Sequence, residues 1–355
     1  MSRIGAPEDL GPAVGHEDGA HRASQQPHRK VFHRCSSRSP GTWSALKSCL
    51  PSRRPGRAPI GYSKHVKPPR FSYAAPATVR EATDLLDSSG GRARVLAGGQ
   101  SLIPMLRHRL LEPEALIDLR RIDGLRDICL DDARRLRLGA MVTHHALQRW
   151  ASDQGQDLLV DAAAHIGHHS VRAIGTVIGS LAHADPSAEW GAVALVLDGV
   201  CRVAGPGGER ELGVEGLFTG PYSTSLAGSE IITSLTLSLP PSCTGAAFSE
   251  VAPRPGDPAV AGAAAAVSLD GPCVESARVA LIGLAPTPCR APSVEAALSG
   301  SEASVGIEAA AQAVENDIAP IGDIHGSEEY RRRVAPVVVA RALRSALVRA
   351  EGDRP

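Results

Sequence analysis

The sequence predicts an α+β protein, because three regions with different apolar patterns follow one another along its 355 residues. The first alternates short helical and β-branched segments, the second consists mainly of short alternating strands with helices between them, and the third has two strands followed by helices. Alternation of apolar and polar residues over a few positions is typical of strands, whereas apolar residues that recur every three or four positions are typical of helices. This length is enough for two or three domains.

The first region is predicted to be a small α/β unit. Pro68 and Pro69 favour an extended segment. Thr78 is placed to cap a helix over 78–88, whose Val79, Ala82, Leu85 and Leu86 share one face. A strand over 93–97, a helix over 101–109 and a strand over 115–119 are expected to follow.

The second and third regions begin near Gly124 and Gly245. In the last helix, an apolar stripe is predicted to pack in the core and arginines to occupy the other face. The second region predicts strands over 125–130, 136–139, 199–204 and 230–237, with helices over 144–150, 156–168 and 189–197. The third region predicts strands over 259–270 and 277–284 and helices over 293–314 and 328–349. The apolar stripe of the last helix consists of Val334, Val337, Val338, Ala342 and Leu347.

The composition excludes several classes of function. The net charge is zero and aromatic residues make up 3%, which argues against a nucleic-acid partner. No apolar run approaches the roughly 20 residues of an integral membrane segment. The seven cysteines are scattered, as expected for a cytoplasmic protein without its own iron–sulfur or zinc site.

Residues 1–65 differ from the rest in being rich in Arg, His, Ser, Pro and Gly. They contain no apolar core of a secretory signal, and Glu8, Asp9, Glu17 and Asp18 argue against a transit peptide. We expect a disordered extension or a start codon assigned too early.

Two similar glycine-containing loops are the most informative feature. Val95–Leu102 reads VLAGGQSL, and Gly175–Ala182 reads GTVIGSLA. Glycine lets backbone N–H groups approach a ligand closely, and successive N–H groups with a Ser hydroxyl can bind phosphate. Each loop alone also fits a plain strand-to-helix connection. Together they predict a site for the two phosphates of a dinucleotide cofactor.

Better-known phosphate motifs are missing from these loops. Neither ends in the Gly-Lys-Ser/Thr of a P-loop, and the glycine spacing in Gly205–Arg210 does not fit a Rossmann turn. A nucleotide triphosphatase and an ordinary nicotinamide dehydrogenase are therefore disfavoured.

Further motifs accompany the two loops in a specific order. With them, the chain resembles the FAD-binding (medium) subunit of the molybdenum hydroxylases, such as carbon monoxide dehydrogenase and xanthine dehydrogenase-like enzymes. The resemblance covers about residues 66–349. Its carriers are KPPRF at 67–71, AGGQSL at 97–102, LIDLRRI at 116–122, GTVIGS at 175–180, HADP at 183–186 with Glu189, FTGPY at 218–222 and YRR at 330–332.

The resemblance implies a two-lobed FAD-binding domain over 66–242, with a small α/β lobe and a larger mixed β lobe. A C-terminal α+β domain with a small antiparallel sheet is implied over 245–350. The cofactor implied by the resemblance is FAD, with its pyrophosphate between the loops. The implied binding residues are Ala97, Gly98, Gly99, Gln100, Ser101, Leu102, Thr176, Val177, Ile178, Gly179 and Ser180, with Asp185 and Glu189 as acidic candidates for ribityl or ribose hydroxyls.

Simpler roles remain open for some of these residues. Asp185 precedes Pro186 and also fits a turn or a helix cap, and Glu189 fits the first turn of a helix. Leu119 and Ile122 fit either the adenine side of the site or the core.

The chain departs from the family pattern at two places. Ile178 stands where the second loop usually has glycine, and we expect ordinary β geometry there because a β-branched residue disfavours positive φ. Pro258 follows Arg254–Asp257 where the family usually has an aromatic residue that can lie near the isoalloxazine ring. This change leaves the shielding of the ring open.

The resemblance implies an electron-transfer oxidoreductase subunit. An iron–sulfur small subunit and a molybdopterin-binding large subunit would be its partners, and electrons from the iron–sulfur clusters would pass through FAD to an acceptor. No residue is predicted to be a catalytic acid, base or nucleophile. His165, His168, His169 and His183 are expected to pack near the second loop and not to bind metal.

Two other functions stay open. One is a self-sufficient flavin oxidoreductase, for which Ser249, Glu250 and Arg254 are the candidate proton donors. The other is a degenerate scaffold subunit without flavin. The sequence identifies neither the substrate of the complex nor its terminal electron acceptor.

Overall fold

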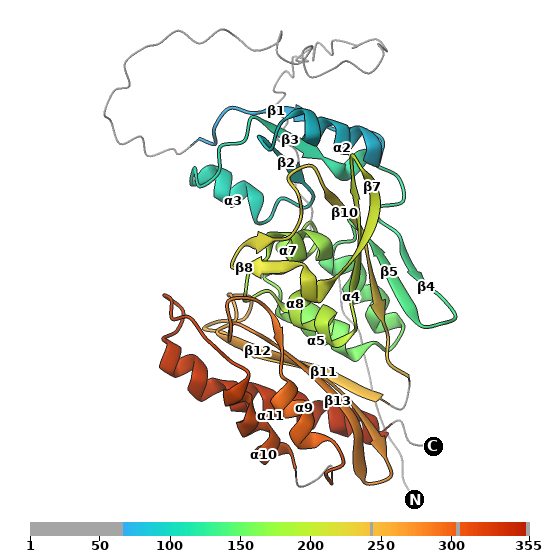
Figure 1. Ribbon diagram of the computed structural model, residues 1–355, viewed down its shortest axis with the longest axis vertical. Helices are drawn as coiled ribbons and strands as arrows, with labels where there is room; N and C mark the ends of the chain where they lie inside the picture. Colours follow the sequence, from blue (N-terminus) through green and yellow to red (C-terminus); the bar gives the residue numbers. More distant parts are fainter. Residues whose placement is uncertain (1–66, 242–243, 303–305, 353–355) are drawn as a thin grey trace, which may run out of the picture. The chain divides into compact units, whose positions relative to one another are not determined.

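The computed structural model describes residues 67–241, 244–302 and 306–352, all of which belong to one compact unit (Figure 1). The predicted extension over 1–65 lies outside these described ranges. Within them, no helix is long and apolar enough to cross a membrane.

The first lobe is a three-stranded parallel sheet with the strand order β1-β3-β2. Helix α2 begins where predicted, since the Thr78 side chain accepts a hydrogen bond from the Glu81 N–H, and it buries Ala82 and Leu86. The predicted small α/β unit is thus confirmed. Its elements are β1 (Ser72–Ala74), α2 (Val79–Ser88), β2 (Ala93–Leu96), α3 (Leu102–Arg107) and β3 (Ala115–Asp118).

The second lobe is built on a five-stranded antiparallel sheet with the order β4-β5-β10-β6-β7. Its central strand is β10 (Ile231–Ser238), beside β5 (Arg135–Gly139) and β6 (Val200–Gly205). All eight residues of α8 (Glu189–Val196) are buried. The other elements are β4 (Ile128–Leu130), β7 (Gly208–Gly213), α4 (His144–Asp153), α5 (Asp157–His165), α6 (His169–Arg172), α7 (Val177–His183) and a small ribbon of β8 (Phe218–Gly220) and β9 (Ser223–Thr224).

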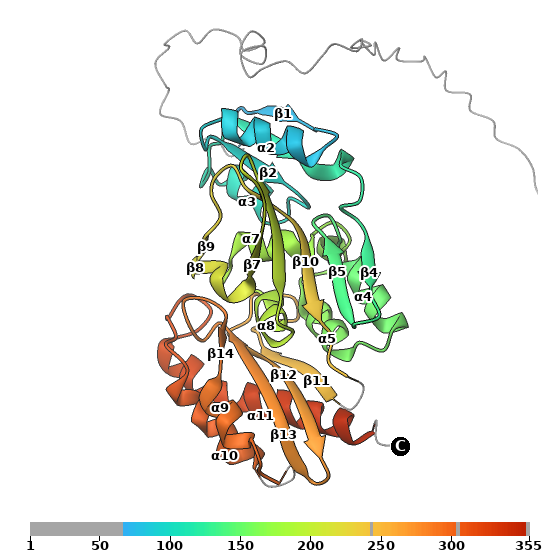
Figure 2. The same cartoon turned by 45° about the vertical axis from the view of Figure 1, so that its right-hand side comes forward.

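The C-terminal part is a four-stranded antiparallel sheet, β11-β12-β13-β14, with helices on both faces (Figure 2). Helix α11 packs on β11 and β12, whereas α8 packs on β12 and β13. Ala263 of β12 belongs to the core under α11 and Ala264 to the core under α8, so both faces are buried and only small residues fit. The elements are β11 (Thr244–Val251), β12 (Ala261–Asp270), β13 (Cys273–Ile282), β14 (Cys289–Arg290), α9 (Pro292–Leu298), α10 (Ile307–Gln312) and α11 (Glu328–Gly352).

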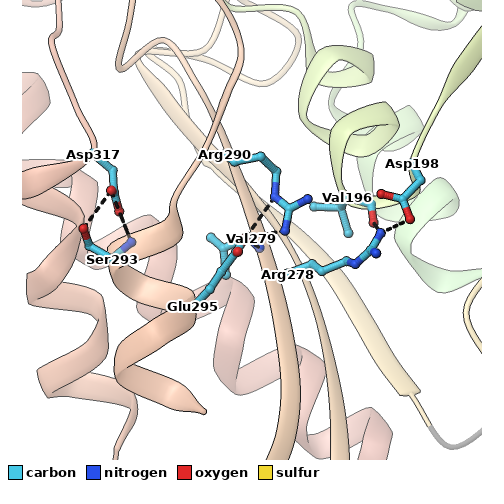
Figure 3. A network of polar contacts seen from close by, with 8 residues as sticks. All are labelled: Val196, Asp198, Arg278, Val279, Arg290, Ser293, Glu295 and Asp317. Carbon is cyan, nitrogen blue, oxygen red and sulfur yellow. Dashed lines mark hydrogen bonds and ion pairs between the residues drawn. The ribbon is translucent and has the colours of Figure 1, made fainter. Parts of the chain in front are cut away.

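Polar contacts fix β13 on both sides, as Figure 3 shows. Arg278 pairs with Asp198 and donates to the Val196 carbonyl oxygen at 3.3 Å, at the end of α8. On the other side, Glu295 of α9 accepts from the Val279 N–H at 2.8 Å and from Arg290. The sheet is therefore tied to the second lobe as well as to its own helices.

Several predicted elements differ from the structure. The helical region predicted over 293–314 consists of two separate helices, α9 and α10. Val337 was predicted to lie in the core stripe, but it is 44% exposed because it points away from the sheet. Strand β7 was missed because this edge strand is mostly polar and exposed and so lacks an apolar alternation.

Candidate functional site

Both glycine loops line a single cavity of about 770 Å³ between the first lobe and the second. Its size is that of a typical cofactor or small-molecule site. The first loop connects β2 to α3, and the second precedes and enters α7. Arg94, Glu230, His183 and Tyr222 also line the cavity.

The first loop supplies a row of free backbone donors. The N–H groups of Gly98, Gly99, Gln100 and Ser101 have no acceptor within the described ranges. Gly99 has φ of 72°, which only glycine adopts without strain. A row of unpaired N–H groups facing a cavity is the arrangement that binds phosphate oxygens.

Gly98 is where the first loop touches the second. A Cβ atom on Gly98 would overlap the Ile174 carbonyl oxygen and come within 2.8 Å of Gly175 Cα. Gly175 in the second loop has no room for a side chain either, since a Cβ atom there would lie 2.9 Å from the His144 ring. The two backbones thus meet at positions where no side chain fits.

The second loop is the start of a helix. Thr176 caps α7, and its Oγ1 accepts a hydrogen bond from the Gly179 N–H at 3.1 Å. Ile178 lies inside α7 and is buried, so the β geometry expected for it is wrong; the helical φ suits a β-branched residue equally well. The Ile178 N–H also has no acceptor in the described part of the chain.

Most of the predicted binding residues come together at this cavity. Val177 does not line it and is fully buried in the core. The lining residues among them are Ala97, Gly98, Gly99, Gln100, Ser101, Leu102, Thr176, Ile178, Gly179 and Ser180.

The acidic candidates Asp185 and Glu189 do not line the cavity. Asp185 accepts from the Ser187 N–H at 2.9 Å, as a turn residue does. Burial and the nearby Asp185 carboxylate raise the pKa of Tyr222. Glu189 is buried in the first turn of α8. Burial and the nearby carboxylates of Glu250 and Asp185 raise the pKa of Glu189 to about 8.

His144, His183 and Tyr222 line the cavity but were not predicted to. His144 is buried, and its Nδ1 accepts from the Trp190 indole N–H at 2.8 Å. Burial and the charge of Arg172 lower the pKa of His144 to about 4, so the ring is neutral and carries its proton on Nε2. Two of them had a sequence signal, because Tyr222 ends the FTGPY motif and His183 begins the HADP motif and was expected to pack near the second loop.

Tyr222 has an unusual backbone at the edge of the cavity. Its φ is 56°, and its N–H donates to the carbonyl oxygen of Ala184, whose φ is 53°. Such left-handed conformations are rare for residues other than glycine and are often found at functional sites. Its ring contacts His183 with 5.2 Å between centroids.

The other predicted histidines do not form one site. His168 and His169 are exposed, and His165 pairs with Glu250 at 3.2 Å, which raises the pKa of His165. Across residues 67–241, 244–302 and 306–352, no group of three or more His, Cys, Asp or Glu is placed to hold a metal ion. Leu119 lines the cavity, whereas Ile122 is in the core.

A lobed α+β fold with two glycine loops around one cavity, whose N–H groups have no acceptor in the described ranges, defines a dinucleotide-binding flavoprotein. Residues 69–240 match the FAD binding domain in molybdopterin dehydrogenase, and residues 246–346 match the CO dehydrogenase flavoprotein C-terminal domain. The chain belongs to the FAD-binding medium subunits of the molybdenum hydroxylase family, and its cofactor is FAD.

Relatives match over nearly their whole length. The chain is 37% identical to the 6-hydroxypseudooxynicotine dehydrogenase complex subunit alpha of Paenarthrobacter nicotinovorans, over 80% of this chain and 97% of that one. It is 34% identical to the carbon monoxide dehydrogenase medium chain of Hydrogenophaga pseudoflava, over 79% of this chain and 99% of that one.

Solved structures agree with this assignment. Carbon monoxide dehydrogenase from Hydrogenophaga pseudoflava superposes with a TM-score of 0.76 at 36% identity, covering 80% of this chain and 99% of that one. Quinoline 2-oxidoreductase from Pseudomonas putida 86 has a TM-score of 0.74 at 34% identity, covering 81% and 99%. The predicted family, fold class and cofactor are thus confirmed.

Proposed function

We propose that this chain holds FAD extended through the 770 Å³ cavity, with the pyrophosphate between the two glycine loops. The observation that carries this proposal is the row of four N–H groups at Gly98–Ser101 that have no acceptor in the described ranges, together with the Ile178 N–H in the second loop. Phosphate oxygens accept hydrogen bonds and tolerate close approach only where side chains are missing. The residues proposed to bind are the ten predicted residues that line the cavity, without Val177, Asp185 and Glu189, which do not line it.

The proposed role is electron transfer within a larger complex. An iron–sulfur subunit would deliver electrons, and a molybdopterin-binding subunit would oxidise the substrate. Bound flavin can link one-electron donors to two-electron acceptors, and the protein positions the cofactor and tunes its electrostatics. We place this chain in the cytoplasm and retain the domain division at 66–242 and 245–350, with 1–65 as a separate extension.

A self-sufficient flavin enzyme is the weaker alternative. It would require a proton donor beside the flavin, and the candidates were Ser249, Glu250 and Arg254. None of the three lines the cavity in the described ranges, and Glu250 is paired with His165. A degenerate scaffold is disfavoured because the helical Ile178 leaves the second loop intact.

The visible absorption spectrum of the purified chain tests the proposal. After addition of FAD and removal of free cofactor, we expect flavin bands close to one FAD per chain. Reduction by the iron–sulfur subunit, followed at the flavin bands, tests the electron-transfer role. Folded protein that stays colourless in the presence of its partners would refute both the FAD site and the electron-transfer role.

A further inference from the structure

One ring nitrogen of His144 is a buried donor without an acceptor. The side chain is 4% exposed and lies in the cavity wall. Its Nδ1 accepts the Trp190 indole N–H at 2.8 Å, so the neutral ring carries its proton on Nε2. No residue within 67–241, 244–302 and 306–352 accepts from this Nε2–H group. A buried donor is costly to leave unpaired, so we expect its acceptor to be a bound molecule.

The Nε2 atom is open to the cavity. In the part of the chain that the structure describes, the fully enclosed side-chain nitrogen and oxygen atoms without a partner are Arg172 Nε, Glu250 Oε2 and Arg331 Nε. His144 Nε2 has no partner and is not one of these atoms, so it keeps some accessible surface. Because the residue is otherwise buried and lines the cavity, this surface faces the cavity.

This nitrogen lies beside the point where the two glycine loops meet. A Cβ atom on Gly175 would be 2.9 Å from His144 Nε2, and a Cβ on Gly98 would be 2.8 Å from Gly175 Cα. The backbone holds the ring there, because the His144 N–H donates to the Gly175 carbonyl oxygen at 3.0 Å. The Nε2–H group is therefore next to Gly98, where the row of unpaired N–H groups over 98–101 begins.

The charge near the ring favours an anionic acceptor. Burial and the positive charge of Arg172 lower the pKa of His144 to about 4, so Arg172 is close to a ring that stays neutral. Its guanidinium is fixed by donating to the carbonyl oxygens of Ile166 and Gly167 at 3.0 and 2.8 Å. A neutral N–H donor beside a fixed cation suits a phosphate oxygen better than a neutral or cationic group.

We propose that His144 Nε2–H is a further hydrogen-bond donor to the pyrophosphate of FAD, and that Trp190 positions it by fixing the tautomer that donates. This inference rests on the proposed function, since it takes FAD to fill this cavity. The two loops would bring the phosphate oxygens to the region beside Gly175, where Nε2 is open. Trp190 is fully buried on α8, which keeps its indole N–H directed at Nδ1.

The first test measures the Kd of the apo full chain for FAD and for ADP, which shares the pyrophosphate but lacks the flavin. His144→Asn keeps an amide oxygen for the Trp190 N–H but is too short to donate from the Nε2 position. Its Kd should rise about tenfold or more for both ligands, as expected for a lost hydrogen bond to a charged group. His144→Gln can place an amide N–H near the Nε2 position and should recover most of the affinity.

The matched control is His168→Asn. His168 is exposed and does not line the cavity, so its replacement should leave both Kd values at those of wild type. Thermal unfolding of each apo variant shows whether it is folded before the titration.

A second test uses the wild-type chain with 15N-labelled histidine and so does not depend on the folding of a variant. The ring N–H signal that disappears in His144→Gln belongs to His144, and it should shift when either FAD or ADP is added. In Trp190→Phe the bond that fixes the tautomer is lost, so an Nδ1–H signal should appear beside the Nε2–H signal and FAD should bind more weakly.

Wild-type Kd values in His144→Asn, or a His144 signal that FAD leaves unchanged, would overturn this inference and leave the FAD site intact. The donor would then be paired with water. Weaker binding of FAD but not of ADP would place the acceptor in the flavin half and would also overturn it. A folded wild-type chain that binds no FAD would overturn both this inference and the proposed function.

Discussion

Gly98 lies directly against Gly175, and this contact joins two loops that are far apart in the sequence. A Cβ on Gly98 would reach within 2.8 Å of Gly175 Cα, and the neighbouring obstacle is the Ile174 backbone. Backbone atoms in a packed turn cannot move aside as a flexible side chain can. The cavity therefore depends on a missing side chain at this position.

Replacing Gly98 with alanine should disrupt this contact. We expect Gly98→Ala to be destabilised by about 1–3 kcal/mol through overpacking and to lose most of its FAD. Absorbance at the flavin bands after desalting, together with thermal unfolding, checks this. Gly207→Ala is the control, since a Cβ there meets nothing within 4 Å. Full flavin retention in Gly98→Ala would show that the loops need not touch.

The sequence predicted the loops and their ligand, but not their contact. Glycines and serines at fixed spacing were visible, so ten of the predicted residues do line one cavity. The Gly98–Gly175 contact depends on how β2 and α6 are packed in three dimensions, which no local pattern records. His144 was missed for the same reason, because its role arises from a bond to Trp190 on a distant helix.

Asp185 and Glu189 show a different limit of what the sequence can predict. Asp185 and Glu189 were expected at the cofactor, but both lie off the cavity wall, and the simpler turn and helix-end roles describe their surroundings. Small changes in the direction of the chain after α7 decide which of the following side chains face the cavity. Val337 was misjudged similarly, because apolar residues such as Tyr330 and Val348 also occur on the exposed side of α11 and leave only a weak apolar stripe in the sequence.

The Thr176 cap is expected to support both the fold and the cofactor. Thr176→Val removes the hydroxyl that accepts from the Gly179 N–H, at a cost of about 1 kcal/mol. If the same ~1 kcal/mol is lost from binding, the Kd for FAD rises about fivefold. Titration of apo protein with FAD measures this. Thr176→Ser keeps the acceptor, and its Kd should stay near that of wild type; equal Kd values for Val and Ser would contradict the prediction.

His144 should make the apo protein sensitive to acid. Its pKa is about 4 in the fold and 6.5 in the unfolded chain, so between these values the unfolded state binds more protons. Stability contributed by the neutral ring is complete above pH 6.5 and is lost as the pH falls towards 4. Between pH 7 and pH 5 the free energy of unfolding should fall by about 2 kcal/mol from this group.

Denaturant titration of apo wild type and His144→Gln at the two pH values isolates this contribution. The variant should show a decrease smaller by about 2 kcal/mol, whatever its stability at pH 7. Trp190→Phe separately tests the hydrogen bond, since it leaves the buried Nδ1 unpaired at a cost of about 1–3 kcal/mol. A pH dependence unchanged in His144→Gln would mean that the ring is not neutralised by burial.

Glu189 should make the apo protein less stable as the pH rises, which is opposite to the effect of His144. Its pKa is about 8 in the fold and 4.5 in the unfolded chain, so the folded state retains a proton that the unfolded state releases. Stability is therefore greatest below pH 4.5 and is lost as the pH rises towards 8. Glu189→Gln places a neutral group of the same shape beside Glu250 and Asp185. We expect this variant to avoid a loss of about 3 kcal/mol between pH 5 and pH 8 in the apo protein.

Unfolding free energies of apo Glu189→Gln and wild type at pH 5 and pH 8 measure this difference. Apo protein is required, because bound FAD would add its own stabilisation and obscure the titration. Glu209→Gln, which changes an exposed carboxylate paired with Arg202, should follow wild type at both pH values. If Glu189→Gln also follows wild type, Glu189 is ionised in the fold, and its role would then be that of a charged group held by partners or by cofactor hydroxyls.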